Sequence, residues 1–406
     1  MPLKTLLANF LPNSARAFHK TAADLSQKLK NIQQTAESQQ QTITNLQTDV
    51  DNLKTIIANQ SKIIKEQKII VDKLANYSYK KSWRSWKKAA STQNFIDFMQ
   101  QENYPQIFNN LIANLDEPSR MWLSLILRRT AAAKDVAEGA TLHYQLTPHE
   151  QQLYDTIDLH HRQSLQIAEN IFLVSGFYLP IMHKPVELIC FNSIFKQIDN
   201  LDFIADKAII DLGAYIGDTL LPFSQLACTS IHCFEPIKKH FDLLQQTITL
   251  NNFSHAVAIN KAVGDTPGKI QFERRSVGSR ILSTKTQQEQ EDLMQKDKIE
   301  DDVEIITLDD YVNEFSLKVG LIKADIEGAE QAMLDGAKQT IFKQKPILLL
   351  SLYHNAEDFF LMKSKIESWN LGYKFKVVKA LPPFNFGNPI FDIMLLAEVN
   401  KKGETP

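Results

Sequence analysis

The sequence predicts an α/β protein in which a doubly wound, mostly parallel sheet follows a long N-terminal helix. Residues 208–212 form an apolar, β-branched run that leads into a glycine loop, and similar buried runs recur at 230–234, 256–263, 321–326 and 346–352. A separate observation predicts the helix, because apolar residues recur in alternating steps of four and three between Leu25 and Leu74. The 406 residues leave room for two or more domains.

The turn after the first strand carries the pattern Asp-x-Gly-x-x-x-Gly, which differs from the Gly-x-Gly-x-x-Gly of dinucleotide enzymes. Glycine lets the backbone approach a ligand, and ligands of doubly wound sheets bind beyond the carboxyl ends of the strands. A carboxylate in such a loop suits a cationic or hydroxylated ligand, which fits S-adenosylmethionine. The predicted cofactor-binding residues of the loop are Asp211, Gly213, Ala214, Tyr215, Gly217, Asp218 and Thr219. The alternative is a tight strand-to-helix turn of the kind found in any α/β protein.

Two further acids extend the predicted cofactor site. Glu235 follows the second predicted strand, where doubly wound folds hold a ribose diol. Its alternative role is that of a carboxylate at a helix start, stabilised by the helix dipole. Asp265 follows the third predicted strand and is expected near the adenine edge, with a turn aspartate as the alternative.

The buried run 321–326 carries charges near its end, which is costly unless the charges are paired or used in chemistry. Lys323, Asp325, Glu327 and Glu330 are therefore expected to gather at the carboxyl edge of the sheet. There the acids can orient an acceptor hydroxyl, take its proton or hold a divalent cation. Lys323 is expected to neutralise one of them.

Tyr353 and His354 follow the fifth predicted strand and are expected at the same edge as Asp325. A neutral imidazole at His354 is a candidate general base, and the alternative is a histidine that caps the next helix. Arg280 heads the polar segment 274–302, which is predicted to form a lid. The predicted catalytic residues are Asp325, Glu327, His354 and Lys323, and the predicted acceptor-binding residues are Arg280, Glu330 and Tyr353. For Arg280 a plain surface arginine is the alternative.

Four motifs in order resemble the FkbM family of S-adenosylmethionine-dependent methyltransferases. They are the glycine loop, Phe234-Glu-Pro236, Thr307-Leu-Asp-Asp-Tyr311 and Ile322-Lys-Ala-Asp-Ile-Glu-Gly-Ala-Glu330. The resemblance covers roughly residues 205–400 and implies a Rossmann-like class I methyltransferase fold, S-adenosylmethionine as cofactor, and O-methylation of sugar hydroxyls in glycans or natural products. A helical lead-in is expected over 95–204 and a short tail over 401–406.

The repeat between residues 21 and 76 predicts a coiled coil that lies outside the resemblance. The a positions are Leu29, Ala36, Ile43, Val50, Ile57, Ile64 and Val71, and Leu is common at d. β-Branched residues at a with Leu at d favour a parallel dimer, whereas Ile56, Ile63 and Ile70 at g widen the seam and leave a trimer open. The alternative is a long helix packed on its own catalytic domain.

Two segments flank this repeat. Residues 1–20 form an amphipathic segment that could lie on a membrane surface or pack on its own oligomer. Residues 77–94 form a basic and aromatic hinge without acids from 76 to 90, suited to anionic lipid headgroups, a phosphorylated glycan carrier or nucleic acid. The alternative is a solvated hinge whose aromatic residues pack on the domain behind it.

The bulk properties narrow the function and the location. The net charge of −2 gives no general signal for nucleic acid, and no nucleic-acid partner is expected. Three cysteines without metal-ligand spacing and no signal-peptide pattern predict a cytoplasmic protein, in peripheral contact with the inner face of the membrane if its acceptor is lipid-linked. A divalent cation is not favoured, although Asp325, Glu327 and Asp358 suit one. The alternative function is an oligomeric scaffold with an inactive methyltransferase fold.

Overall fold

The structure is a computed structural model that describes residues 13–78, 83–88, 90–273, 280–281, 299–379, 390 and 393–399. The chain divides into two compact units, residues 1–81 and 82–406. The first unit ends inside the segment predicted as a hinge.

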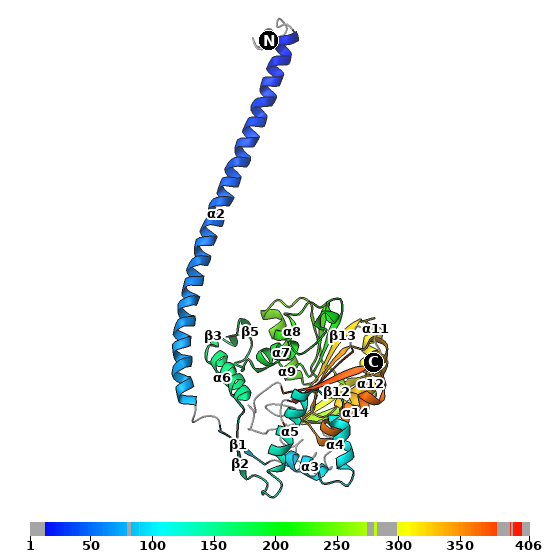
Figure 1. Cartoon of the computed structure of the whole chain (residues 1–406). Coiled ribbons are helices and arrows are strands. Elements are labelled where there is room, and N and C mark those ends of the chain that lie inside the picture. The colour runs from blue at the N-terminus through cyan, green and yellow to red at the C-terminus, as the bar shows by residue number, and fades with distance from the viewer. Residues whose placement is uncertain are drawn as a thin grey trace. The chain divides into compact units, whose positions relative to one another are not determined.

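The described part of the first unit is one helix, α2 (Asn13–Ser78), which runs without a break for 66 residues (Figure 1). It contains no proline or glycine, so nothing in its sequence interrupts the backbone hydrogen bonds. The predicted coiled-coil segment lies wholly within it. Among the described residues, no helix combines the length and the apolar character needed to cross a bilayer.

The second unit begins with a strand where a hinge was predicted. β1 (Trp83–Lys87) pairs antiparallel with β2 (Thr141–Gln145), and α3 (Ala90–Phe98) follows. Lys88 is 5% exposed, and its Nζ donates a hydrogen bond to the backbone oxygen of Val136 at 2.7 Å. The hinge prediction is therefore corrected for this half of the segment. The aromatic side chains proposed for lipid contact, Tyr77, Tyr79, Trp83 and Trp86, lie outside the side chains that the structure describes.

The lead-in is not entirely helical as predicted, because it contains a small antiparallel sheet. Its helices are α4 (Tyr104–Ile112), α5 (Glu117–Ala131), α6 (Pro148–Arg162), α7 (Val186–Phe195) and the 3-10 turn η1 (Leu201–Ile204). Between α6 and α7 run β3 (Leu165–Ala168), β4 (Ile171–Val174) and β5 (Phe177–Leu179). The turn between β4 and β5 holds Ser175 and Gly176 at φ of 51° and 92°, as tight hairpins require.

The main sheet has the strand order β15-β16-β14-β13-β6-β7-β8, which confirms the predicted α/β class. Its strands are β6 (Ala208–Leu212), β7 (Ser230–Phe234), β8 (Ala256–Ile259), β13 (Val319–Ala324), β14 (Ile347–Ser351), β15 (Tyr373–Lys379) and β16 (Ile393–Val399). The pairs from β8 to β14 are parallel, and β16 is antiparallel to both of its neighbours. The chain reverses its direction of winding between β6 and β13, and ligands of such sheets bind at that switch point.

The third predicted strand, residues 256–263, is divided between two sheets. β8 ends at Ile259, and β9 (Ala262–Val263) joins a second sheet of order β11-β10-β12-β9. The other strands of that sheet are β10 (Gly268–Glu273), β11 (Arg280–Ile281) and β12 (Ile299–Ile306).

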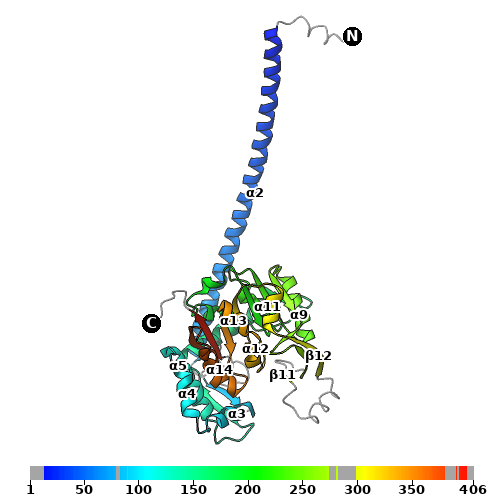
Figure 2. The same ribbon diagram turned by 90° about the vertical axis from the view of Figure 1, so that its right-hand side faces the viewer.

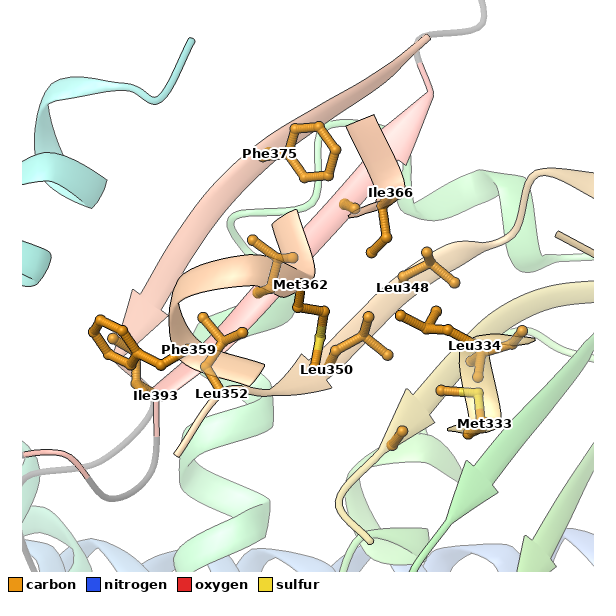
Figure 3. Packing of buried hydrophobic residues seen from close by; sticks show 14 of the residues in the cluster. Met333, Leu334, Leu348, Leu350, Leu352, Phe359, Met362, Ile366, Phe375 and Ile393 are labelled. Carbon is orange, nitrogen blue, oxygen red and sulfur yellow. The ribbon is translucent and has the colours of Figure 1, made fainter. Parts of the chain in front are cut away.

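Helices cover both faces of the main sheet. They are α8 (Leu220–Phe223), α9 (Lys238–Leu250), α11 (Leu308–Glu314), α12 (Glu330–Gly336), α13 (Lys338–Gln344) and α14 (Ala356–Ser368) (Figure 2). Successive strand residues point to opposite faces, so Leu348 and Leu350 pack under α12 and α14, whereas Leu349 packs with α7 to α9 (Figure 3). The lead-in helices α3 to α5 contribute Phe95, Leu111 and Leu123 to the first of these cores.

Candidate active site

The glycine loop, residues 213–217, joins β6 to α8 at the carboxyl edge of the sheet. Gly213 and Gly217 have φ of 78° and 85°, a region that favours glycine. A Cβ at Gly213 would overlap the backbone oxygen of Asp325, and a Cβ at Gly217 would lie 3.0 Å from Leu244 of α9. Gly213 thus brings this loop into direct contact with the loop after β13. The helix after the glycine loop, α8, is only four residues long and is entirely buried.

A buried ion pair lies beneath the glycine loop. The Nζ of Lys323 is 3.0 Å from the Oδ1 of Asp211, and these side chains are 2% and 0% exposed. Lys323 also donates to the backbone oxygens of Leu212 and Gly213 at 3.1 and 2.8 Å, and Thr219 donates its hydroxyl hydrogen to Asp211. Burial acts to lower the pKa of Lys323, but the Asp211 carboxylate raises it above its ordinary value.

These contacts correct two predictions. Asp211 was expected to contact the cofactor, yet its carboxylate has no exposed surface and is occupied by Lys323 and Thr219. Lys323 was expected to neutralise an acid after β13, yet its direct partner is Asp211 on the neighbouring strand. The pair stabilises the glycine loop from below, because burying either charge alone would be costly.

Glu235 fastens the glycine loop from the tip of β7. One of its carboxylate oxygens accepts a hydrogen bond from the backbone N–H of Tyr215, and the other accepts one from Ile237, each at 2.9 Å. Tyr215 has φ of 47°, a strained conformation for a residue with a side chain. The carboxylate therefore lies beside the glycine loop, as its predicted role at the cofactor site requires. It also lies at the start of α9, as its alternative role at a helix start requires. Each oxygen can accept a second hydrogen bond from a ligand hydroxyl.

A histidine from the lead-in lies between two acids beside the glycine loop, and we call His183, Glu187 and Asp218 the lead-in triad. The Nε2 of His183 is 3.1 Å from Asp218 and 3.6 Å from Glu187. Burial acts to lower the pKa of His183, but the two carboxylates raise it to about 10. Burial and the charge of Asp218 raise the pKa of Glu187, and the charge of His183 acts against this shift. The ring of Tyr215 lies 5.8 Å from His183 and 4.6 Å from His240 between ring centres.

Asp325 heads the acidic loop, residues 325–330, which follows β13. The hydroxyl of Tyr353 donates to its two oxygens at 2.9 and 3.1 Å, and the Nε2 of His354 lies 3.2 Å from Oδ1. Burial acts to raise the pKa of Asp325, but His354, Lys323 and Tyr353 together lower it below its usual range. The side chain is 35% exposed, so an ionised carboxylate of fixed orientation faces the solvent.

His354 lies between Asp325 and Glu330, whose charges favour its protonated form. Its side chain is 6% exposed, and its Nδ1 lies 2.9 Å from Glu330. Burial acts to lower the pKa of His354, but Glu330 and Asp325 raise it well above its usual range. These surroundings disfavour the predicted role of a neutral imidazole as general base, because a charged imidazolium has no lone pair to accept a proton.

Glu330 points inward, which corrects its predicted contact with the acceptor. It is fully buried and accepts hydrogen bonds from the backbone N–H groups of Ile326 and Gly328 at 2.8 and 3.0 Å. Asp358 lies next to it and is also fully buried. Burial and the Glu330 charge raise the pKa of Asp358 to about 8, so this acid is neutral at lower pH. A buried Asp358 does not suit the metal-dependent alternative.

Glu327 remains at the surface of the acidic loop with φ of 57°. Its carboxylate is 3.9 Å from the Nε2 of His354, and its side chain is 42% exposed. Two groups of residues bring three potential metal-ligand atoms within 4.8 Å of one another, namely the lead-in triad and the set Asp325, Glu330 and His354. In the second set, Glu330 already accepts two backbone hydrogen bonds, which leaves less capacity for an ion.

The remaining predicted residues lie away from these two loops or outside the described part. Asp265 is exposed, and its backbone lies close to Gly336 at the end of α12. The backbone of Arg280 belongs to β11, but its side chain and most of the predicted lid lie outside the described residues. Sequence reasoning missed His183 and Glu187. It also missed Asn260, which donates to the backbone oxygens of Glu235 and Pro236 at 2.9 Å.

Comparison with known proteins agrees with this arrangement. Residues 211–375 match the family model of the methyltransferase FkbM domain. A methyltransferase FkbM from Methylobacillus flagellatus is similar in structure, with 18% identity and a TM-score of 0.46 over 75% of this chain. Fibrillarin from Aeropyrum pernix with bound S-adenosylmethionine is 13% identical over 57% of this chain and 83% of its own, with a TM-score of 0.32.

A precorrin-6y C5,15-methyltransferase from Geobacter metallireducens is 10% identical over 50% of this chain and 86% of its own, with a TM-score of 0.29. The match spans 60% of the Methylobacillus protein. No curated protein matches the chain in sequence. Because the family model covers the glycine loop, Glu235, the acidic loop and His354 in one continuous match, the segment from residue 211 to 375 is a methyltransferase domain of the FkbM family.

Proposed function

We propose that this chain transfers a methyl group from S-adenosylmethionine to a hydroxyl of a sugar in a glycan or related natural product. One observation carries the proposal: Gly213 of the glycine loop touches the backbone of Asp325, the first residue of the acidic loop. A site for the methyl donor and a carboxylate for the acceptor therefore meet at the switch point of the sheet.

The residues around the glycine loop fit a cationic nucleoside cofactor. Gly213 and Gly217 let the loop pack closely against Asp325 and Leu244, and Glu235 retains acceptor capacity for ribose hydroxyls. The lead-in triad places two acids beside the loop, which suits a sulfonium and an ammonium group. When bound, S-adenosylmethionine supplies a methyl group that is already activated for transfer. The chain's own contribution on this side is to hold the cofactor and to exclude water.

On the acceptor side, Asp325 orients the hydroxyl and accepts its proton. A carboxylate with a lowered pKa is a weak base, but an acceptor oxygen that gains a methyl group becomes strongly acidic, so a weak base suffices. Tyr353 and the His354 imidazolium fix the orientation of the carboxylate, which lowers the entropic cost of alignment. Exposed Glu327 lies next to this group and is placed to contact the acceptor.

The choice of acceptor is supported by the resemblance of the four motifs to FkbM enzymes and by the polar character of the exposed acidic loop. A pair of fixed carboxylates suits the hydroxyls of a sugar, which donate hydrogen bonds to charged oxygens. The basic and aromatic segment 77–94 supports a phosphorylated or lipid-linked form of this acceptor.

Two measurements test the proposal. Isothermal titration of the full chain with S-adenosylhomocysteine should show binding at one site per chain, and an absence of heat at millimolar ligand would end the methyltransferase proposal. Mass spectrometry of surface glycans from a deletion strain should then show one methyl group fewer per modified sugar. Glycans unchanged in mass, together with normal cofactor binding, would exclude the glycan acceptor but keep the methyltransferase. Adding a chelator to the assay tests whether a divalent cation takes part.

A further inference from the structure

The large apolar side chains of the described part of α2 form one stripe along the helix. They are 47–67% exposed, although residues of this kind are usually buried. The ten residues are Leu25, Leu29, Ile32, Ile43, Leu46, Val50, Leu53, Ile56, Ile57 and Ile64. Nine of them occupy a or d of the heptad repeat, and Ile56 at g borders the stripe. At 1.5 Å per residue, the stripe from Leu25 to Ile64 is about 60 Å long.

The charges of α2 avoid this stripe. Lys30, Glu37, Asp51 and Lys65 occupy b, and Lys62 occupies f, so all five lie on the outer face of the helix. The period of 3.5 residues keeps an apolar seam in contact with a second helix that supercoils around the first. A surface that is apolar along one line and charged elsewhere is complementary to another copy of itself.

The few charged residues beside the stripe favour one orientation. In a parallel pair each g residue faces the e residue of the next heptad in the partner helix. Asp49 occupies g and Lys54 occupies e, so two copies bring Asp49 of each chain opposite Lys54 of the other. Lys28 at g would face Gln33 at e, which adds no repulsion. Within one chain Lys54 instead pairs with Asp51, at 2.9 Å and with both side chains more than two-thirds exposed.

We infer that α2 pairs in parallel with α2 of a second copy of this chain, forming a two-stranded coiled coil. β-Branched residues dominate the a positions and leucine recurs at d, the combination that favours two strands over three or four. Gln39 and Gln60 at d place polar layers in the seam, which fix the register at a cost in stability. This inference does not depend on methyl transfer.

The mass of the full chain in solution tests the inference. Light scattering coupled to size exclusion should give twice the 46.3 kDa of one chain, about 93 kDa. The double variant Leu46→Lys with Leu53→Lys places four charges in the seam of a pair and should give a monomer. The matched control, Asn45→Lys with Asn52→Lys, adds the same charges at two c positions and should stay dimeric. A monomeric or trimeric wild type, or equal dissociation of both double variants, would overturn the inference.

Cross-linking tests the orientation. A parallel pair places Leu29 opposite its own copy near one end of the helix, so Leu29→Cys should form a disulfide-linked dimer under mild oxidation. All variants carry Cys228→Ser, because Cys228 is partly exposed whereas Cys190 and Cys233 are buried. In this background Gln34→Cys at the outer f position should not form the disulfide, and neither should the chain without an added cysteine. Lys54→Asp should weaken the dimer at least several-fold, and adding Asp49→Lys should restore it. An antiparallel pair would give neither the Leu29→Cys cross-link nor the charge-swap rescue.

Discussion

The glycine loop and the acidic loop follow neighbouring strands, β6 and β13, and are built on the same plan. Each contains a non-glycine residue in the left-handed region, Tyr215 at φ of 47° and Glu327 at 57°. Each is fastened by a buried glutamate that accepts two backbone hydrogen bonds, Glu235 in the first loop and Glu330 in the second. Strained backbone persists only where its surroundings hold it in place, and these glutamates do so.

The loops differ in what each offers to a ligand. The side chain of His354 is buried behind the acidic loop and is only 6% exposed. It fixes the orientation of the Asp325 carboxylate, which faces the solvent. His183 beside the glycine loop is 26% exposed and lies between two acids, Glu187 and Asp218. The difference indicates that the acidic loop positions one reacting group, whereas the surroundings of the glycine loop attract a cation. Substitutions in each loop should therefore separate turnover from cofactor binding.

The largest effect is expected from Asp325→Asn, which keeps the shape of the side chain but removes the charge that orients and deprotonates the acceptor. Methyl transfer should fall by roughly 10²- to 10⁴-fold in single-turnover assays. Binding of S-adenosylhomocysteine, measured by titration calorimetry, should change by less than about threefold, because the proposed cofactor site lies at the glycine loop. The exposed acid Asp310 provides the control variant Asp310→Asn. Full turnover by Asp325→Asn would show that another group accepts the proton of the acceptor hydroxyl, with Glu327 as the next candidate.

A smaller effect, on binding instead of turnover, is expected from Glu235→Gln. The amide loses the charge and places an N–H group near the backbone donors of Tyr215 and Ile237, which would loosen the glycine loop. Hydrogen bonds to charged groups contribute about 1.5–3 kcal/mol, so the Kd for S-adenosylhomocysteine should rise roughly 10- to 100-fold. Titration calorimetry against the surface control Glu357→Gln measures this rise. A Kd within twofold of the wild type would show that Glu235 serves only the start of α9.

The fold and the location of the site could be predicted, but the direction of several side chains could not. Buried β-branched runs identified β6, β7 and β14, and the order of strands fixed which edge carries Asp325 and Glu235. Glu330 was expected to face outward, because spacing along an irregular loop does not specify which residues turn inward to satisfy backbone N–H groups. His354 was predicted at the correct edge, but its charge depends on two carboxylates whose positions only the folded chain determines.

The contribution of the lead-in was missed for a different reason. His183 and Glu187 precede the first strand of the main sheet and approach the glycine loop only through tertiary packing. Their spacing of four residues, which brings side chains together on a helix, was the one available signal. The Ser175-Gly176 pair, which forms the turn between β4 and β5, could likewise have predicted the small antiparallel sheet.

His183→Gln should weaken cofactor binding by roughly 3- to 10-fold, because it disorders the triad without removing the carboxylates. It should also change the pH dependence of stability. The folded pKa of about 10 lies above the ordinary 6.5, so the stabilisation is fully present below pH 6.5 and is lost as the pH rises towards 10. The difference in Tm between wild type and variant should be largest at about pH 6.5 and should shrink as the pH rises towards 10. A difference independent of pH would show that His183 is neutral.

The smallest effect is expected from Asp358→Asn, which probes the interior of the acidic loop. The folded pKa of about 8 lies above the ordinary 3.8, so ionisation of Asp358 costs stability progressively as the pH rises between these values. Asparagine copies the neutral acid: its amide can donate towards Glu330 and its oxygen can accept from Asn355. The variant should therefore gain in Tm over the wild type from pH 5 to pH 8 by at most a few degrees per pH unit, measured by scanning fluorimetry. The control Asp310→Asn should show no such trend. A variant that loses stability equally at every pH would mean that Asp358 is ionised in the fold and adds a further negative charge beside Glu330.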